Sequence, residues 1–188
     1  VVIQMPDGEG TTATEPYPTF SGTEVFFKST EAATFTDLTG LANGDCVSVT
    51  ALVDLFGHQI QLSKPTAFAK TGGCGNAPAP AVKTVDSIND TGPDSKKFLD
   101  TLVTVNSVTC DVDSSGNNGS FEIADANSKK IFVNGFFMTP KPAAASGDTF
   151  SSVSGVLTQF DVTDQTTHEV TATHFDIDPR DASDLVSP

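Results

Sequence analysis

Apolar and polar residues alternate along much of the chain with a period of two, which is typical of β-strands. The segment Cys46–Leu55 alternates most regularly and places Val47, Val49, Ala51 and Val53 on one face. Further segments with strand character are Val1–Met5, Glu24–Lys28, Gln59–Leu62, Leu99–Cys110, Ser120–Ala124, Ile131–Asn134, Thr149–Val162 and His168–Phe175. Helical periodicity is nearly absent, so the sequence predicts an all-β protein.

The two halves of the chain carry the same order of elements. The first half reads IQMPDG, VFF and NGDCVSVTALV, and the second reads FEIADAN, IFV and SGDTFSSVSGVL. A segment rich in Gly, Pro and Ala separates them and has the composition of a stiff linker. The sequence therefore predicts a first domain at residues 1–72, a linker at 73–94 and a second domain at 95–188.

Two copies of one small unit favour two similar barrels over a single sandwich. Five-stranded Greek-key barrels of the oligonucleotide/oligosaccharide-binding (OB) type suit units of this size. The runner-up is a pair of immunoglobulin-like sandwiches, but each copy has few strands and the chain lacks Trp.

Several segments resemble, in order, the OB-like region of large secreted bacterial nucleases of the endonuclease/exonuclease/phosphatase superfamily. They are VVIQMPDGEGTTATEPYPTFSGTEVFF, GLANGDCVSVTALVDLFGHQIQL, APAPAV, KKFLDTLVTVNSVT and DPRDASDL. The resemblance implies tandem OB-like barrels, an acidic Asp-Gly turn after the first strand, and a Pro-Ala linker. Nothing here is similar to the family's catalytic domain, so no catalytic residue is carried over and we expect no enzymatic activity.

The resemblance also implies that the first barrel lacks its first strand, because family members have another strand before this point. Either that strand is missing from this sequence, or another segment takes its place. The segment Val1, Val2, Ile3, Gln4 and Met5 would then form an edge that accepts a strand from a partner.

The charge balance bears on partners. There are 24 acidic and 10 basic residues, for a net charge of −14, so direct contact with a phosphate backbone is disfavoured. The pair Lys129-Lys130 is the best local candidate for an anion contact. No apolar run is long enough to span a bilayer. The sequence carries no secretory leader, which we interpret as a mature chain or a fragment.

The cysteines are Cys46, Cys74 and Cys110. Folding the chain at Gly57 brings the two arms of a hairpin together and predicts a Cys46–Cys74 disulfide. The alternative is three buried free thiols. No pair has the spacing of a zinc or haem site.

One loop has the spacing of a calcium site. It carries oxygen ligands at Asp111, Asp113, Ser115, Asn117 and Glu122, with a glycine at its sixth position. The flanks read as strands, so a polar hairpin loop explains the same residues. Both interpretations remain open, with Ca²⁺ as the candidate cofactor.

These observations favour a non-catalytic structural or interaction module of an extracellular bacterial protein. Its partner would be another protein or further copies of this chain, joined by strand addition to the incomplete barrel. The alternative is an accessory region of a secreted nuclease that binds nucleic acid, with the doublets Phe26-Phe27 and Phe136-Phe137 as stacking candidates.

Overall fold

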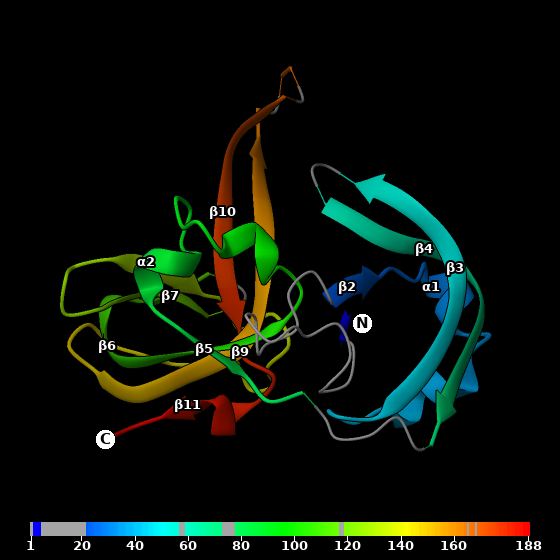
Figure 1. Cartoon of the computed structure of the whole chain (residues 1–188), viewed down its shortest axis with the longest axis horizontal. Helices are drawn as coiled ribbons and strands as arrows, with labels where there is room; N and C mark the ends of the chain where they lie inside the picture. Colours follow the sequence, from blue (N-terminus) through cyan, green and yellow to red (C-terminus); the bar gives the residue numbers. More distant parts are fainter. Residues whose placement is uncertain are drawn as a thin grey trace, which may run out of the picture.

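The computed structural model describes residues 2–4, 22–56, 59–72, 78–116, 119–164, 166–167 and 169–188. Strands dominate these residues and form two sheets, so the predicted all-β class is confirmed. The first sheet lies on one side of the molecule and the second on the other, as Figure 1 shows. The finer prediction, two barrels of the OB type, stays a prediction.

The first sheet contains four strands in the order β1-β2-β4-β3. These are β1 (Val2–Gln4), β2 (Gly22–Val25), β3 (Cys46–Phe56) and β4 (Gln59–Thr71). β2 runs parallel to β4, whereas β1–β2 and β3–β4 are antiparallel pairs. Between β2 and β3 the chain forms two short helices, α1 (Ser29–Ala32) and η1 (Thr36–Gly40).

The second sheet contains seven strands in the order β11-β9-β10-β8-β7-β6-β5, with an additional pairing of β9 with β6. The strands are β5 (Ala81–Lys83), β6 (Leu102–Ser115), β7 (Ser120–Ala124), β8 (Lys130–Val133), β9 (Thr149–Thr163), β10 (Val170–Asp178) and β11 (Leu185–Val186). The β9–β6 pairing closes a ring that runs β6-β7-β8-β10-β9 and back to β6. Within the ring only β8 and β10 are parallel.

The pairing pattern of the first sheet repeats inside this ring. The sequence β1-β2-β4-β3 corresponds to β7-β8-β10-β9, including the one parallel pair in each. The first sheet has no counterpart of β6 among the described residues. The repeat that the sequence predicts is therefore present in the strand pairing, and the described part of the first copy has one strand fewer.

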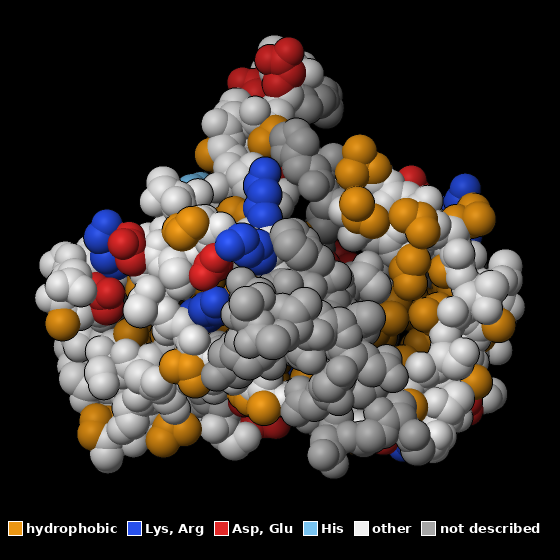
Figure 2. All heavy atoms as spheres, viewed as in Figure 1, with side chains coloured by type: hydrophobic (Ala, Val, Ile, Leu, Met, Phe, Trp, Pro, Cys, Tyr) orange, Lys and Arg blue, Asp and Glu red, His pale blue; other side chains and the backbone are white. Residues whose placement is uncertain are grey.

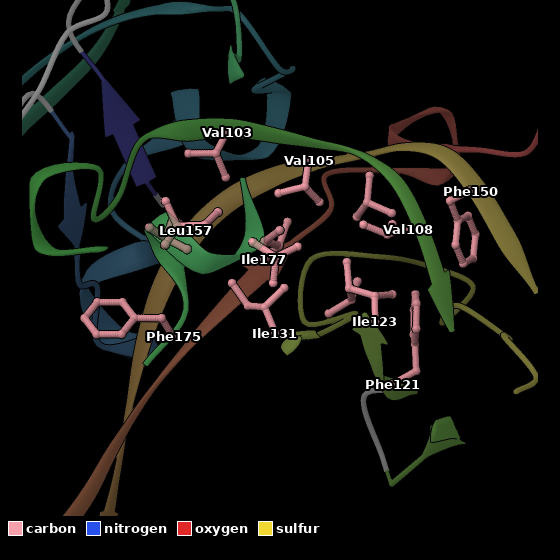
Figure 3. Close-up of a cluster of buried hydrophobic side chains, with 14 of the residues drawn as sticks. Val103, Val105, Val108, Phe121, Ile123, Ile131, Phe150, Leu157, Phe175 and Ile177 are labelled. Atoms are coloured by element: carbon pink, nitrogen blue, oxygen red, sulfur yellow. The ribbon is translucent and has the colours of Figure 1, made fainter. Parts of the chain in front are cut away.

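The main hydrophobic core lies inside the closed ring. All of its buried members fall between Ala81 and Ile177, and Figure 3 shows them as one elongated cluster, with Phe175 and Leu157 toward one end and Phe121 and Phe150 toward the other. The first sheet has a smaller apolar contact, in which Phe27, Phe35 and Phe68 meet edge to face with ring centroids 5.4–6.4 Å apart.

Two elements lie inside the segment that the sequence predicts as linker. β5 pairs with β6 in parallel, and α2 (Val85–Ile88) buries Val85 and Ile88 in the main core. A third short helix, η2 (Ser95–Lys97), follows, and η3 (Ala182–Asp184) precedes β11. Residues 81–97 thus belong to the second unit by their packing.

The two units are in direct contact. The side-chain oxygen of Gln4 accepts a hydrogen bond of 2.9 Å from the backbone N–H of Leu102. Gly22 lies so close to Asp100 that a Cβ atom at this glycine would be 1.9 Å from the Asp100 carbonyl oxygen. Only glycine fits this backbone contact, which packs β2 against the second unit.

Candidate functional site

A pocket of about 150 Å³ lies between the two units. Its walls come from strands β2, β9 and β10, from the segment that follows β8, and from Asp100, which lies just before β6. Four carboxylates line it: Glu24, Asp100, Asp176 and Asp178. None of the described residues that line it is a Lys, Arg or His.

The two aspartates of β10 occupy the outer face of the ring. Their neighbours Phe175 and Ile177 point into the core, so alternation along the strand directs Asp176 and Asp178 outward. Both are nevertheless buried, at 8% and 3% exposure, because the first unit and the segment after β8 cover this face.

Burial raises the pKa of Asp178 to about 7 and that of Asp176 to about 6. The hydroxyl of Thr158 donates a hydrogen bond of 2.5 Å to Oδ2 of Asp178, and this bond partly offsets the effect. Among the described residues, Oδ1 of Asp178 is buried and has no hydrogen-bond partner. A buried carboxylate oxygen without a partner is costly, so this atom is the most unusual feature of the site.

Aromatic rings stand at the pocket. Phe136, Phe137 and Phe160 line it and are 61%, 38% and 60% exposed. The rings of Phe136 and Phe137 meet edge to face at 5.3 Å, in a turn rather than in a strand. Both members of this doublet are therefore exposed, whereas in the other doublet Phe26 is exposed and Phe27 packs inward.

The second candidate site is the open first sheet. Register places Val25, Leu62 and Val53 in one row across β2, β4 and β3, with the directly opposed pair Leu55 and Ile60 on the same face. Val53, Leu55 and Ile60 are 74%, 65% and 64% exposed. Figure 2 shows apolar side chains in the hollow bordered by β3 and β4.

The corresponding row of the closed ring is fully buried. There Val133, Ile177 and Leu157 lie across β8, β10 and β9, and each has 0% exposure. Leu157 occupies the position of Val53, and its strand pairs with β6 over Leu102–Thr109. The difference between 0% and 74% exposure thus coincides with a strand, β6, that has no counterpart in the described part of the first unit.

The predicted calcium loop forms the hairpin between β6 and β7. Asp111 forms an ion pair with Lys130, Asp113 accepts a 2.5 Å hydrogen bond from the Ser146 N–H, and Glu122 lies 3.4 Å from Lys130. Ser115 pairs with Ser120 in the ladder, and Asn117 lies outside the described residues. In the part of the chain that is described, no three Asp, Glu, His or Cys side chains gather as metal ligands. Calcium binding at this loop stays a prediction.

The predicted disulfide involves Cys74, which lies outside the described residues, so this pairing also stays a prediction. Cys46 begins β3, and its sulfur accepts a hydrogen bond of 3.2 Å from the Thr71 hydroxyl. Cys110 is a buried free thiol whose S–H donates to the Val112 carbonyl, and burial raises its pKa.

The predicted strand-accepting segment corresponds to β1, which lies at one edge of the first sheet. Val2, Ile3 and Gln4 pair with β2, while Val1 and Met5 lie outside the described residues. The other edge is β3, so an added strand between β3 and β1 would close the first sheet as β6 closes the second.

The predicted anion contact is neutralised by acidic partners. Lys129 lies 2.8 Å from Asp86, and Lys130 is paired with Asp111. No helix in the described part of the chain is long and apolar enough to cross a membrane.

Sequence reasoning missed Asp176 and Asp178. The segment HFDID alternates as any half-exposed strand does, and such a pattern predicts that its acidic residues face water. Their burial follows from the packing of one unit on the other, which leaves no local pattern. The only indication in the sequence is that Asp176 and Asp178 alternate with the apolar residues of the same strand.

Comparison with known proteins gives no relationship. No family model matches the chain, no curated protein matches it, and no solved structure matches its fold. The class of protein is therefore defined by its fold: an all-β chain of two sheets, one closed into a ring and one open.

Proposed function

We propose that this chain is a non-catalytic interaction module whose first unit binds an extended β-strand of a partner protein or of a second copy. The observation that carries the proposal is the contrast between Val53 and Leu157, which share a row position but differ from 74% to 0% in exposure. An added strand would cover the exposed residues Val53, Leu55 and Ile60 and pair with β1 and β3, which are the two outer strands of the first sheet among the described residues.

Both units are OB-type barrels in this proposal, and the first lacks its first strand. Support comes from the ring order β6-β7-β8-β10-β9, in which strands one to three are consecutive, strand five lies beside strand three, and strand four closes on strand one. The resemblance to the OB-like region of secreted bacterial nucleases points the same way, and with it we assign the chain to an extracellular bacterial protein.

The nucleic-acid alternative has less support. The lysine pair that would contact phosphates is already engaged by Asp86 and Asp111, and the net charge is −14. Strand addition needs no positive surface, since its affinity comes from backbone hydrogen bonds and apolar side chains.

The strand that fits can be specified from the second unit. β6 is antiparallel to both of its ring neighbours and presents alternating apolar residues, among them Val103 and Val105, to the core. A fluorescent peptide with the sequence of residues 102–109, LVTVNSVT, is therefore the probe, and a scrambled peptide without alternation is its control.

Binding is measured by fluorescence anisotropy against the folded chain. We expect saturable binding of the alternating peptide, and at least tenfold weaker binding to the Val53→Asp variant. Leu52→Asp is the matched control, because Leu52 is also exposed, at 57%, but belongs to the opposite face of β3. Equal affinity for both peptides, or equal effects of the two substitutions, would refute the proposal.

A further inference from the structure

The pocket between the units combines negative charge with a missing hydrogen-bond partner. Among the described residues, four carboxylates and no basic side chain line it, so the field of these residues favours a cation. Lys141, the cation whose charge lowers the pKa of Asp178, is held elsewhere: its ammonium donates to the carbonyl oxygens of Gly135 and Phe136 at 2.9 and 3.2 Å.

The unpartnered Oδ1 of Asp178 is an independent observation. Asp178 is 3% exposed and lines the pocket, and its Oδ2 accepts a hydrogen bond from the Thr158 hydroxyl. The backbone N–H of Phe136 also acts on this carboxyl and lowers its pKa, but among the described residues no donor lies in hydrogen-bond geometry to Oδ1. A group that donates hydrogen bonds and carries positive charge would satisfy this oxygen.

The first unit provides an internal comparison. At the equivalent diagonal of β3 and β4, the Ser63 hydroxyl donates a hydrogen bond of 3.0 Å to Oδ2 of Asp54. In the first unit the carboxylate is on β3 and the hydroxyl is on β4, whereas in the second unit the hydroxyl is on β9 and the carboxylate is on β10. Asp54 is exposed. The hydroxyl–carboxylate bond is thus common to both units, whereas the buried carboxylate with a free oxygen occurs only in the second.

The aromatic rings at the pocket favour a particular class of cation. Phe136, Phe137 and Phe160 are exposed beside the carboxylates, and ring faces attract ammonium groups electrostatically. A pocket of about 150 Å³ is also several times larger than the space of one water molecule or a bare ion. A neutral sugar could stack on the aromatic rings but would gain nothing from the negative charge of the carboxylates.

We propose that this pocket binds a protonated alkylamine, with the ammonium hydrogen-bonded to Oδ1 of Asp178 and its alkyl part against Phe160. The amine is either a free small molecule or the side chain of a lysine in a partner protein. The two sources share one chemistry and differ only in what is attached to the alkyl chain.

The test is isothermal titration calorimetry of the full chain with three probes. n-Butylammonium represents the free amine, the blocked peptide acetyl-Gly-Lys-Gly-amide represents the lysine side chain, and methyl glucoside represents a neutral sugar. We expect saturable binding of at least one ammonium probe and none of the glucoside, and the tighter of the two ammonium probes identifies the source.

Variants separate a specific site from general attraction to an acidic protein. Asp178→Asn keeps the shape of the side chain and should weaken ammonium binding at least tenfold, while Glu169→Gln removes the same charge from the exposed β9–β10 connection and should leave it unchanged. Phe160→Leu keeps an apolar side chain at an exposed position and should weaken binding about two- to fivefold.

Three outcomes would overturn the proposal: no saturable ammonium binding, equal effects of Asp178→Asn and Glu169→Gln, or glucoside binding as tight as that of the ammonium probes. Amide chemical shifts of each variant serve as the folding control. Since Phe160 is exposed, its variant remains informative if the Asp178 variant fails to fold.

Discussion

Two Gly-Asp turns show the internal repeat at the scale of single residues. Gly44 and Gly147 have φ values of +87° and +95°, in the left-handed region that favours glycine. In each turn the following aspartate accepts a hydrogen bond from an alanine N–H three residues earlier, at 2.7 Å for Asp45 and 2.8 Å for Asp148. The same turn therefore precedes β3 and β9 and starts the long strand of each unit.

Substitution of Gly147 by alanine tests the role of this turn. A Cβ atom at Gly147 meets nothing within 4 Å, so the expected loss of about 1–2 kcal/mol in unfolding free energy comes from the left-handed backbone alone. Gly40→Ala is the control, because its Cβ is also unobstructed and its φ is not positive. Urea unfolding should show a lower midpoint for the first variant only, and equal midpoints would contradict this explanation.

The buried aspartates predict a dependence of stability on pH. Because burial raises the pKa of Asp178 to about 7 and that of Asp176 to about 6, the folded state holds more protons than the unfolded state between about pH 4 and pH 7. Stability therefore falls as the pH rises through this window and levels off above it. The neighbouring charges of His174, Asp90 and Lys141 modify the size of this effect but not its sign.

Asp178→Asn should remove most of this fall. Between pH 5 and pH 8 the wild-type chain should lose about 2 kcal/mol more unfolding free energy than the variant, an estimate that follows from the shifted pKa. Chemical unfolding of both proteins at the two pH values measures the difference. A variant that loses as much stability as the wild type would show that Asp178 is ionised at little cost.

At the scale of elements, strand positions were predicted well where apolar residues recur at every second position. β7 coincides with the predicted Ser120–Ala124, and β3 extends the predicted Cys46–Leu55 by one residue. Apolar residues occupy every second position of both segments, so a period of two is visible in the sequence even though Leu52 is a further apolar residue in β3.

Elements were missed where packing, rather than alternation, determines them. β4 continues to Thr71 although Pro65 and a left-handed Lys64 interrupt the pattern after Leu62. The irregular register between β3 and β4 accommodates both, and the strand resumes because Phe68 is buried against Phe27 and Phe35.

The sequence also did not predict β5 and α2, for a related reason. They follow a run of Ala and Pro that is typical of an extended linker, and each has only three or four residues. Ala81, Val85 and Ile88 are buried in the core, but that contact depends on β6 and β8, which come later in the chain. No local pattern predicts such a pairing.

The contact between the units is an element-scale feature with its own prediction. Gly22 of β2 packs directly on the backbone of Asp100, and a Cβ atom there would overlap the carbonyl oxygen at 1.9 Å. Gly22→Ala should therefore loosen the first unit from the second, so that amide exchange accelerates in β1 and β2 while the β6–β9 amides stay protected. Unchanged exchange in β1 and β2 would show that this contact does not hold the units together.

At the scale of the whole molecule, the two units differ in how much apolar surface they bury. The closed ring contains the main core, whereas Val53, Leu55 and Ile60 on the apolar face of the open sheet remain in contact with water. Apolar residues that alternate on one face of a strand are selected by burial, so their exposure indicates a surface that another segment covers. The internal repeat allows this comparison, because the equivalent residues of the second unit are covered by β6 and buried.

The most direct measurement joins a strand with the sequence of β6 to the first unit. A fusion that places LVTVNSVT and a short turn before Val1 supplies the strand in the position that β6 has before β7. Hydrogen exchange of the β3 amides is then compared between the fusion and a fusion with the scrambled sequence. We expect slowed exchange along Cys46–Phe56 only in the first, because its amides gain strand partners. Identical exchange in both fusions would contradict the claim that the first sheet lacks one strand.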